Sequence, residues 1–304
     1  MLKKFLIRKN SFLDKDIQSY YSRDYIRYKA EGNPDFINHL KNQFNTADKS
    51  IIQNAKSELM EVIYEDLPKI REFHNTELSV CVVPRAKAEN YYSNNQKVFR
   101  RSISEIVGSL DGFEDCTQFI VRQINTRTTH MDMRGHGGDG DMPYTGITKA
   151  TCNISNNIAG RNILLIDDIY TKCVNIDEDV IQTLLDLGAN SVIFYAVGRT
   201  TFKKAALLKG RIQETFSALD NESDLEIIAH MMGVSKSTII GHIEKIVSIL
   251  GSDSVMHIKP PHSTLCAVEN AVMKVGRERW KPIFEELKGE VSYDDIRVSL
   301  MFIN

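Results

Sequence analysis

The sequence predicts an α/β protein with a mostly parallel sheet, followed by an all-α C-terminal domain that contains a helix-turn-helix. Short apolar runs rich in β-branched residues alternate with amphipathic segments, which is typical of parallel strands joined by crossover helices. Two adjacent acids follow one of these runs directly, and beyond residue 200 only helical spacing remains. The expected parts are a helical N-terminal segment (1–75), an α/β domain (76–200) and a helical domain (201–304).

Composition and charge exclude several classes of protein. The 304 residues are 42% hydrophobic and 26% charged, as in an ordinary globular protein. A net charge of −2 gives no argument for nucleic-acid binding by the chain as a whole. Five scattered cysteines without a CxxC spacing indicate a reducing compartment rather than disulfides or a zinc site. We expect a cytoplasmic protein, since no segment has the length of a signal peptide or a membrane span.

Residues 11–75 are expected to be helical. Tyr20, Tyr21, Tyr25 and Tyr28 fall at near-helical spacing, which favours a packed stripe over a surface for stacking a nucleobase.

The segment from residue 78 to residue 145 supplies the first strands and a long loop. Leu78–Val83 is a continuous apolar run suited to a buried strand. A crossover helix is expected at Gln96–Leu110 and another strand at Gln118–Arg122. The glycine-rich stretch from Met131 to Thr145 has too little packing potential for regular structure and is expected to be a loop.

The stretch Ile163–Asn175, ILLIDDIYTKCVN, is the most informative part of the chain. Four apolar residues lead into Asp167 and Asp168, and a short polar loop then leads into a helix at 176–188. Ligands bind at the carboxyl ends of strands in open α/β sheets, and a helix N-terminus offers N–H groups to an anion. The alternative is that both acids begin an ordinary solvated turn.

These thirteen residues resemble the phosphoribosyl pyrophosphate (PRPP) signature of type I phosphoribosyltransferases. The resemblance implies a phosphoribosyltransferase fold in which Asp167 and Asp168 hold the ribose hydroxyls. It also implies a loop for the 5′-phosphate, made of Thr171, Lys172, Cys173, Val174 and Asn175. Three of these residues depart from the family pattern, because Lys172, Cys173 and Asn175 replace Thr, Gly and Thr. The acids at 177–179 would also repel a phosphate.

A wider stretch is similar to the ComF-like branch of the phosphoribosyltransferases. It contains Pro84-Arg85, Asn95-Gln96 and the stretch Arg127-Thr128-Thr129 ahead of the signature. The similarity implies that Arg85 and Lys87 bind pyrophosphate and that the glycine-rich loop, with Arg134 and His136, closes as a lid. It also implies Mg²⁺ carried by PRPP rather than by a protein site. The alternatives are two solvated surface cations and a disordered connection.

The C-terminal part contains a helix-turn-helix pattern at residues 223–246. Ser223 and Glu226 form an expected capping box, Gly233 ends the first helix and Ser235 begins the second. The stripe expected to be buried is Ile239, Ile243 and Ile246. This pattern looks like the small domain of LuxR-type regulators and, with the tail at 292–297, more like the C-terminal module of RecQ-type helicases.

Four residues of the second helix are candidate nucleic-acid contacts: Lys236, Ser237, Thr238 and His242. From residue 201 onward, however, thirteen Lys and Arg face fourteen Asp and Glu, which supplies little attraction for phosphates. The alternative is a helix pair for protein contact or homo-oligomerisation. Trp280 is expected to anchor the small core, with base stacking as its alternative.

The leading hypothesis is therefore a PRPP-binding phosphoribosyltransferase-like enzyme, joined to a helix-turn-helix for DNA or a nucleoprotein partner. One alternative is a regulator that senses PRPP or a nucleotide without turnover. Another is an effector or accessory protein of a phage-defence system.

Overall fold

The computed structural model describes residues 1–26, 28–126, 150–172, 175–202, 205, 207–219 and 222–303. The chain divides into two compact units, residues 1–201 (unit 1) and residues 202–304 (unit 2), and each is described by itself.

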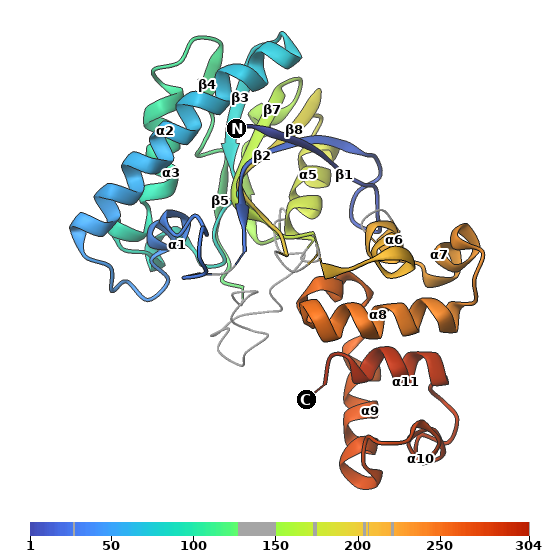
Figure 1. Cartoon of the computed structure of the whole chain (residues 1–304). Helices are drawn as coiled ribbons and strands as arrows, with labels where there is room; N and C mark the ends of the chain where they lie inside the picture. Colours follow the sequence, from blue (N-terminus) through green and yellow to red (C-terminus); the bar gives the residue numbers. More distant parts are fainter. Residues whose placement is uncertain are drawn as a thin grey trace. The chain divides into compact units, whose positions relative to one another are not determined.

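Unit 1 is built on a six-stranded sheet with the strand order β1-β2-β8-β7-β3-β4 (Figure 1). β1 is antiparallel to β2, and the other neighbouring strands are parallel. β5 and β6 form a separate antiparallel ribbon. The strands are β1 (Lys3–Ile7), β2 (Ile17–Tyr25), β3 (Leu78–Val82), β4 (Phe113–Asp115), β5 (Ile120–Arg122), β6 (Cys152–Ile154), β7 (Asn162–Tyr170) and β8 (Ser191–Thr200).

Helices cover both faces of this sheet. In Figure 1, α2 and α3 lie on one face and α5 on the other, and each face has its own hydrophobic core. The helices of unit 1 are α1 (Phe36–Lys41), α2 (Lys49–His74), α3 (Val98–Val107) and α5 (Ile176–Asp186), with 3₁₀ turns η1 (Glu89–Tyr91), η2 (Asn94–Gln96) and η3 (Asn156–Ile158).

β7 is buried on both faces, as its continuous apolar run predicts. Ile163 and Leu165 pack into the core beneath α5, while Leu164 and Ile166 pack into the core beneath α2 and α3. Because side chains alternate along a strand, the same alternation sends Asp167 and Asp168 to opposite faces.

The prediction of helix over residues 11–25 is wrong. Tyr20, Tyr21 and Tyr25 lie in β2, which pairs in parallel with β8. Tyr20 packs into one core and Tyr21 into the other, so both rings are buried although they are adjacent. Burial on both faces hides the two-residue alternation that marks a strand, and chance spacing then resembles a helix. The N-terminal segment thus contributes strands to the sheet as well as the predicted helical part.

Other elements of unit 1 lie close to their predicted places, with one exception. β3, α3 and α5 fall within the expected segments. β5 falls within the predicted strand at 118–122, but it belongs to the separate ribbon, and β4 takes the edge position of the sheet instead. The expected lid lies in residues 127–149, outside the described residues.

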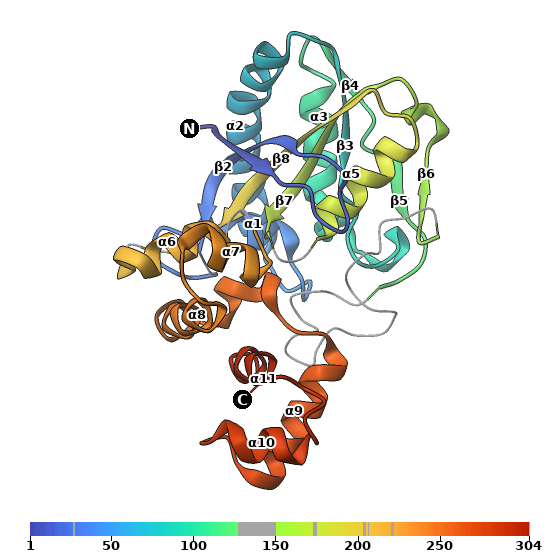
Figure 2. The ribbon, with the colours of Figure 1, turned by 90° about the vertical axis from the view of Figure 1, so that its right-hand side faces the viewer.

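In the described residues of unit 2 the regular secondary structure is helical, in keeping with the prediction (Figure 2). α6, α7 and α8 share one core, while α9, α10 and α11 enclose a smaller one. Its elements are α6 (Gly210–Leu219), α7 (Leu225–Met232), α8 (Lys236–Leu250), η5 (Ser252–Ile258), α9 (His262–Val275), α10 (Trp280–Glu286) and α11 (Tyr293–Leu300).

The helix-turn-helix forms at α7 and α8. Gly233 adopts the left-handed conformation that ends α7, and Ser235 caps α8 by accepting the N–H of Thr238. The predicted inward stripe Ile239, Ile243 and Ile246 is fully buried.

Two smaller predictions for unit 2 are wrong. The cap of α7 is Asp224, not Ser223, and its carboxylate accepts the N–H groups of Glu226 and Ile227. Trp280 is 44% exposed, and the buried members of that core are Val268, Ala271, Ile283 and Ile296. None of the described helices is long and apolar enough to cross a membrane.

Candidate functional site

The twin acids lie near the carboxyl end of β7, between β8 and β3. The first residue after β3, Val83, donates its N–H to the carbonyl of Ile166 at 2.9 Å. The loop that follows β3 therefore begins beside Asp167. In open α/β sheets, ligands bind at these carboxyl ends of the parallel strands.

Asp168 forms an ion pair with Lys41, a residue that sequence reasoning missed. Lys41 Nζ lies 2.9 Å from Asp168 Oδ1, and the side chains are 27% and 17% exposed. Lys41 is the last residue of α1, whose buried Phe36, Ile37 and Leu40 fix its place. Desolvation opposes the charged ammonium, but the carboxylates of Asp168 and Asp167 raise the pKa of Lys41 overall.

Asp167 faces the start of α5 and shares a hydrogen bond with the carboxyl group of Asp177. Desolvation, together with the charge of Asp168, raises the pKa of Asp167 to about 7. Desolvation and the charges of Asp167 and Glu178 raise the pKa of Asp177 well above its ordinary value. Two neighbouring carboxylates repel each other, so their proximity opposes ionisation of both groups at once.

Glu178 adds a third buried carboxyl group. Its Oε1 accepts the Tyr170 hydroxyl at 2.9 Å, and desolvation raises the pKa of Glu178 to about 7. Glu178 Oε2 and Asp177 Oδ1 are both buried without a hydrogen-bond partner. From the sequence alone, the acids at 177–179 are expected to repel a phosphate at the start of this helix. In the structure Asp177 and Glu178 are buried, and desolvation raises the pKa of both carboxyl groups, which opposes the build-up of negative charge at this helix end.

The predicted phosphate loop is described at Thr171, Lys172 and Asn175, whereas Cys173 and Val174 lie outside the described residues. The hydroxyl groups of Thr171 and Thr200 are 2.7 Å apart, which ties the loop to the end of β8. Asn175 has a left-handed backbone (φ 56°, ψ 14°), a conformation that asparagine tolerates better than most residues. Its Oδ1 accepts the side-chain amide of Asn10 at 3.2 Å.

The side chain of Arg85 makes hydrogen bonds within unit 1 and is not a solvated surface cation. Its Nη1 donates to the carbonyls of Lys41 (2.8 Å) and Gln96 (3.0 Å), and its guanidinium stacks over Tyr92. Arg85 thereby holds the end of α1, and with it the Lys41–Asp168 pair. Lys87 is buried, and Arg134 and His136 lie outside the described residues.

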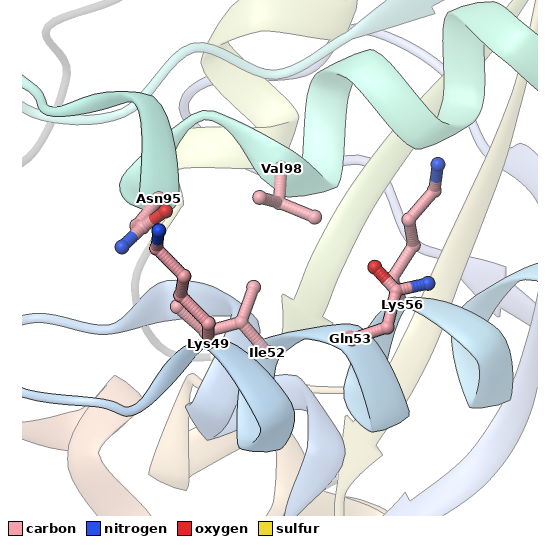
Figure 3. Close-up of a pocket in the computed structure, with 6 residues that line it drawn as sticks. All are labelled: Lys49, Ile52, Gln53, Lys56, Asn95 and Val98. Atoms are coloured by element: carbon pink, nitrogen blue, oxygen red, sulfur yellow. The ribbon is translucent and has the colours of Figure 1, made fainter.

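A hollow of about 230 Å³ lies between the first turns of α2 and the beginning of α3 (Figure 3). Its wall consists of Lys49, Ile52, Gln53, Lys56, Asn95 and Val98, so neither aspartate of the pair lines it. Within the described part of the chain, no group of three or more His, Cys, Asp or Glu side chains is arranged to hold a metal ion.

In unit 2, the four candidate nucleic-acid contacts lie on α8, but most have protein partners. Lys236 Nζ is 3.5 Å from Glu226, and Ser237 Oγ accepts Arg297 Nη1 at 2.8 Å. Thr238 is exposed beside the Ser235 hydroxyl (2.9 Å), and His242 Nδ1 lies 2.7 Å from Thr215 Oγ1. Arg297 also binds Glu244 through two contacts of 3.0 Å.

Comparison with known families gives a match within unit 2. A family model described as a helix-turn-helix domain matches residues 211–300, which suggests DNA binding. No curated protein and no solved structure matches the chain. Since the family match covers only unit 2, a phosphoribosyltransferase function for unit 1 is a proposal.

Proposed function

We propose that unit 1 binds PRPP in the manner of a phosphoribosyltransferase and that the helix-turn-helix of unit 2 binds DNA. The observation that carries the first part is the placement of Asp167 and Asp168 near the carboxyl end of a central parallel strand, beside the loop that follows β3. The family match carries the second part.

Groups that match the ribose and the diphosphate of PRPP lie near the acids. Asp168 accepts hydrogen bonds from the ribose hydroxyls, since a carboxylate has lone pairs to spare beyond its contact with Lys41. Asn175 supplies the backbone turn that leads the phosphate loop into α5. Lys41, rather than the engaged Arg85, supplies the positive charge for the diphosphate.

The proposed reaction is attack of a nitrogen nucleophile on the anomeric carbon. The new C–N bond forms as the C–O bond to pyrophosphate breaks, and the electron pair leaves with pyrophosphate. The nucleophile loses its proton to solvent water as the new bond forms. Magnesium would arrive on the diphosphate and offset its charge.

Isothermal titration with PRPP and Mg²⁺ tests the binding. We expect Asp168→Asn and Lys41→Met to weaken binding at least tenfold, as loss of a charge-assisted contact of about 1.5–3 kcal/mol implies. Asp186→Asn, an exposed change on α5, serves as the matched control. Wild-type affinity in Asp168→Asn, or no heat from the wild-type protein, would contradict the proposal.

A second candidate, a ligand-sensing regulator without turnover, is favoured by one observation. Both acids already have protein partners, Lys41 for Asp168 and Asp177 for Asp167. A regulator would bind PRPP without releasing pyrophosphate. Its binding of DNA, measured by gel shift, would change when PRPP is added. Pyrophosphate release in the presence of a nucleobase would favour the enzyme instead.

A further inference from the structure

Arg297 of α11 joins three helices of unit 2. Its Nε and Nη2 donate to the two carboxylate oxygens of Glu244 on α8, both at 3.0 Å. Its Nη1 donates to the hydroxyl of Ser237 at 2.8 Å and lies 3.4 Å from the carbonyl oxygen of the same residue. The ring of Trp280, from α10, lies over the guanidinium, with its centroid 4.8 Å from Cζ. The Arg297 side chain is only 9% exposed, so it is a buried link between helices and not a surface cation.

The contacts of Arg297 with α8 span two turns of that helix. Ser237 and Glu244 are seven residues apart, and at 3.6 residues per turn such residues lie on nearly the same side of a helix. Gly241 lies between them, and a Cβ atom there would be 3.8 Å from Arg297 Nη2. Because one side chain holds both ends of this stripe, it opposes rotation of α8 about its own axis.

A second face of α8 is held by the core of the helix-turn-helix. Ile239, Ile243 and Ile246 are fully buried in the core that α8 shares with α6 and α7. In Figure 1, α8 lies between α6 and α7 on one side and α11 on the other. The stripe that contains Thr238 and Lys245, again seven residues apart, is exposed. The rotation of α8 therefore decides which side chains this helix presents to solvent, and the second helix of a helix-turn-helix is the one that enters the major groove of DNA.

We propose that Arg297 is a positioning residue for DNA recognition, because it sets the rotation of α8 and thereby the side chains that meet the base edges. The inference rests on the DNA-binding part of the proposed function. Ion pairs removed from solvent contribute little net stability, but they can specify one arrangement of packed helices. Arginine suits this role because its planar fork binds a carboxylate through two hydrogen bonds in a defined orientation. Arg297 thus acts on recognition through Ser237 and Glu244 and need not touch the DNA itself.

The sequence preference of the full-length chain for DNA tests the inference. The wild-type chain is incubated with duplexes that have a randomised centre, and fluorescence anisotropy then gives its affinity for the enriched duplex and for the unselected pool. Arg297→Lys keeps the charge but loses the two-pronged contact, so it should weaken binding to the enriched duplex about tenfold. Its affinity for the pool and the slope of log K against log salt should stay unchanged, because no phosphate contact is removed.

Arg277→Lys is the matched control. Arg277 Nη2 donates to two backbone carbonyls at and beyond the end of α11, at 3.1 and 3.4 Å, so the same substitution loosens this end but leaves the contacts of Arg297 with α8 in place. It should keep the wild-type preference. Glu244→Gln, which retains the contacts of Arg297 with Ser237, should reduce the preference by a smaller factor and replaces Arg297→Lys if that variant does not fold. Circular dichroism at the assay temperature establishes that each variant is folded, so a loss of stability alone does not change the ratio of the two affinities.

The outcomes separate the inference from its premise. If the wild-type chain binds no duplex, the DNA-binding proposal fails, and the inference fails with it. If the wild-type chain binds DNA but enriches no sequence, α8 does not read bases, and the inference is wrong although DNA binding stands. If folded Arg297→Lys and Glu244→Gln keep the wild-type preference, or weaken binding to the enriched duplex and to the pool alike, Arg297 does not act by positioning α8.

Discussion

At the scale of single residues, three carboxyl groups around the start of α5 make the stability of the protein depend on pH. Asp167, Asp177 and Glu178 all have raised pKa values because the fold desolvates them and places them together. A carboxyl group whose pKa is raised by folding makes its full contribution to stability at pH values below the pKa that it has in the unfolded chain. That contribution is lost as pH rises through the folded pKa.

Glu178→Gln tests this linkage. Folding raises the pKa of Glu178 from 4.5 to about 7, which corresponds to a loss of up to about 3 kcal/mol between those pH values. The variant should therefore gain stability relative to wild type as pH rises from 4.5 to 7, with a constant difference above pH 8. Urea unfolding at several pH values measures this difference.

The matched control is Glu58→Gln on the exposed side of α2. It should change stability equally at all pH values. A difference between Glu178→Gln and wild type that does not vary between pH 5 and pH 8 would show that Glu178 ionises normally.

At the scale of elements, the turn between α7 and α8 depends on two local signals. Gly233 provides the left-handed residue that ends α7, and Ser235 satisfies an unpaired N–H at the start of α8. Both signals were readable in the sequence because capping is a local interaction.

Ser235→Ala should lower the free energy of unfolding of unit 2 by about 1 kcal/mol, the usual effect of losing an N-cap. Ser248→Ala, which removes an exposed hydroxyl bonded to a carbonyl of the same helix, is the control and should have a smaller effect. Chemical denaturation followed by circular dichroism measures both changes. Equal effects would mean that the Ser235 cap contributes nothing particular to α8.

At the scale of the whole molecule, the two units have separate hydrophobic cores. The cores of unit 1 lie on the two faces of its sheet, and those of unit 2 lie among its helices. Since each unit is compact by itself, each should unfold as its own cooperative transition.

Calorimetry of the full chain should therefore show two transitions. Leu165→Ala, in the fully buried centre of β7, should lower the midpoint temperature of the transition of unit 1. Ile243→Ala, in the buried stripe of α8, should lower that of unit 2. If either substitution lowers both transitions equally, the units unfold together and the prediction is wrong.

The sequence alone determined the parallel-strand pattern around β7, the helix-turn-helix and the residues that cap α8. These features follow from hydrophobic spacing and capping, which depend on residues that are close together in the sequence. The tertiary structure decided what the sequence could not express, namely that Tyr20 and Tyr21 lie in a doubly covered strand and that Lys41 pairs with Asp168. It also decided that Arg85 secures α1 and that Asp167 meets Asp177. Such contacts join segments far apart in the chain or set side chains against a particular face, and only folding brings those atoms together.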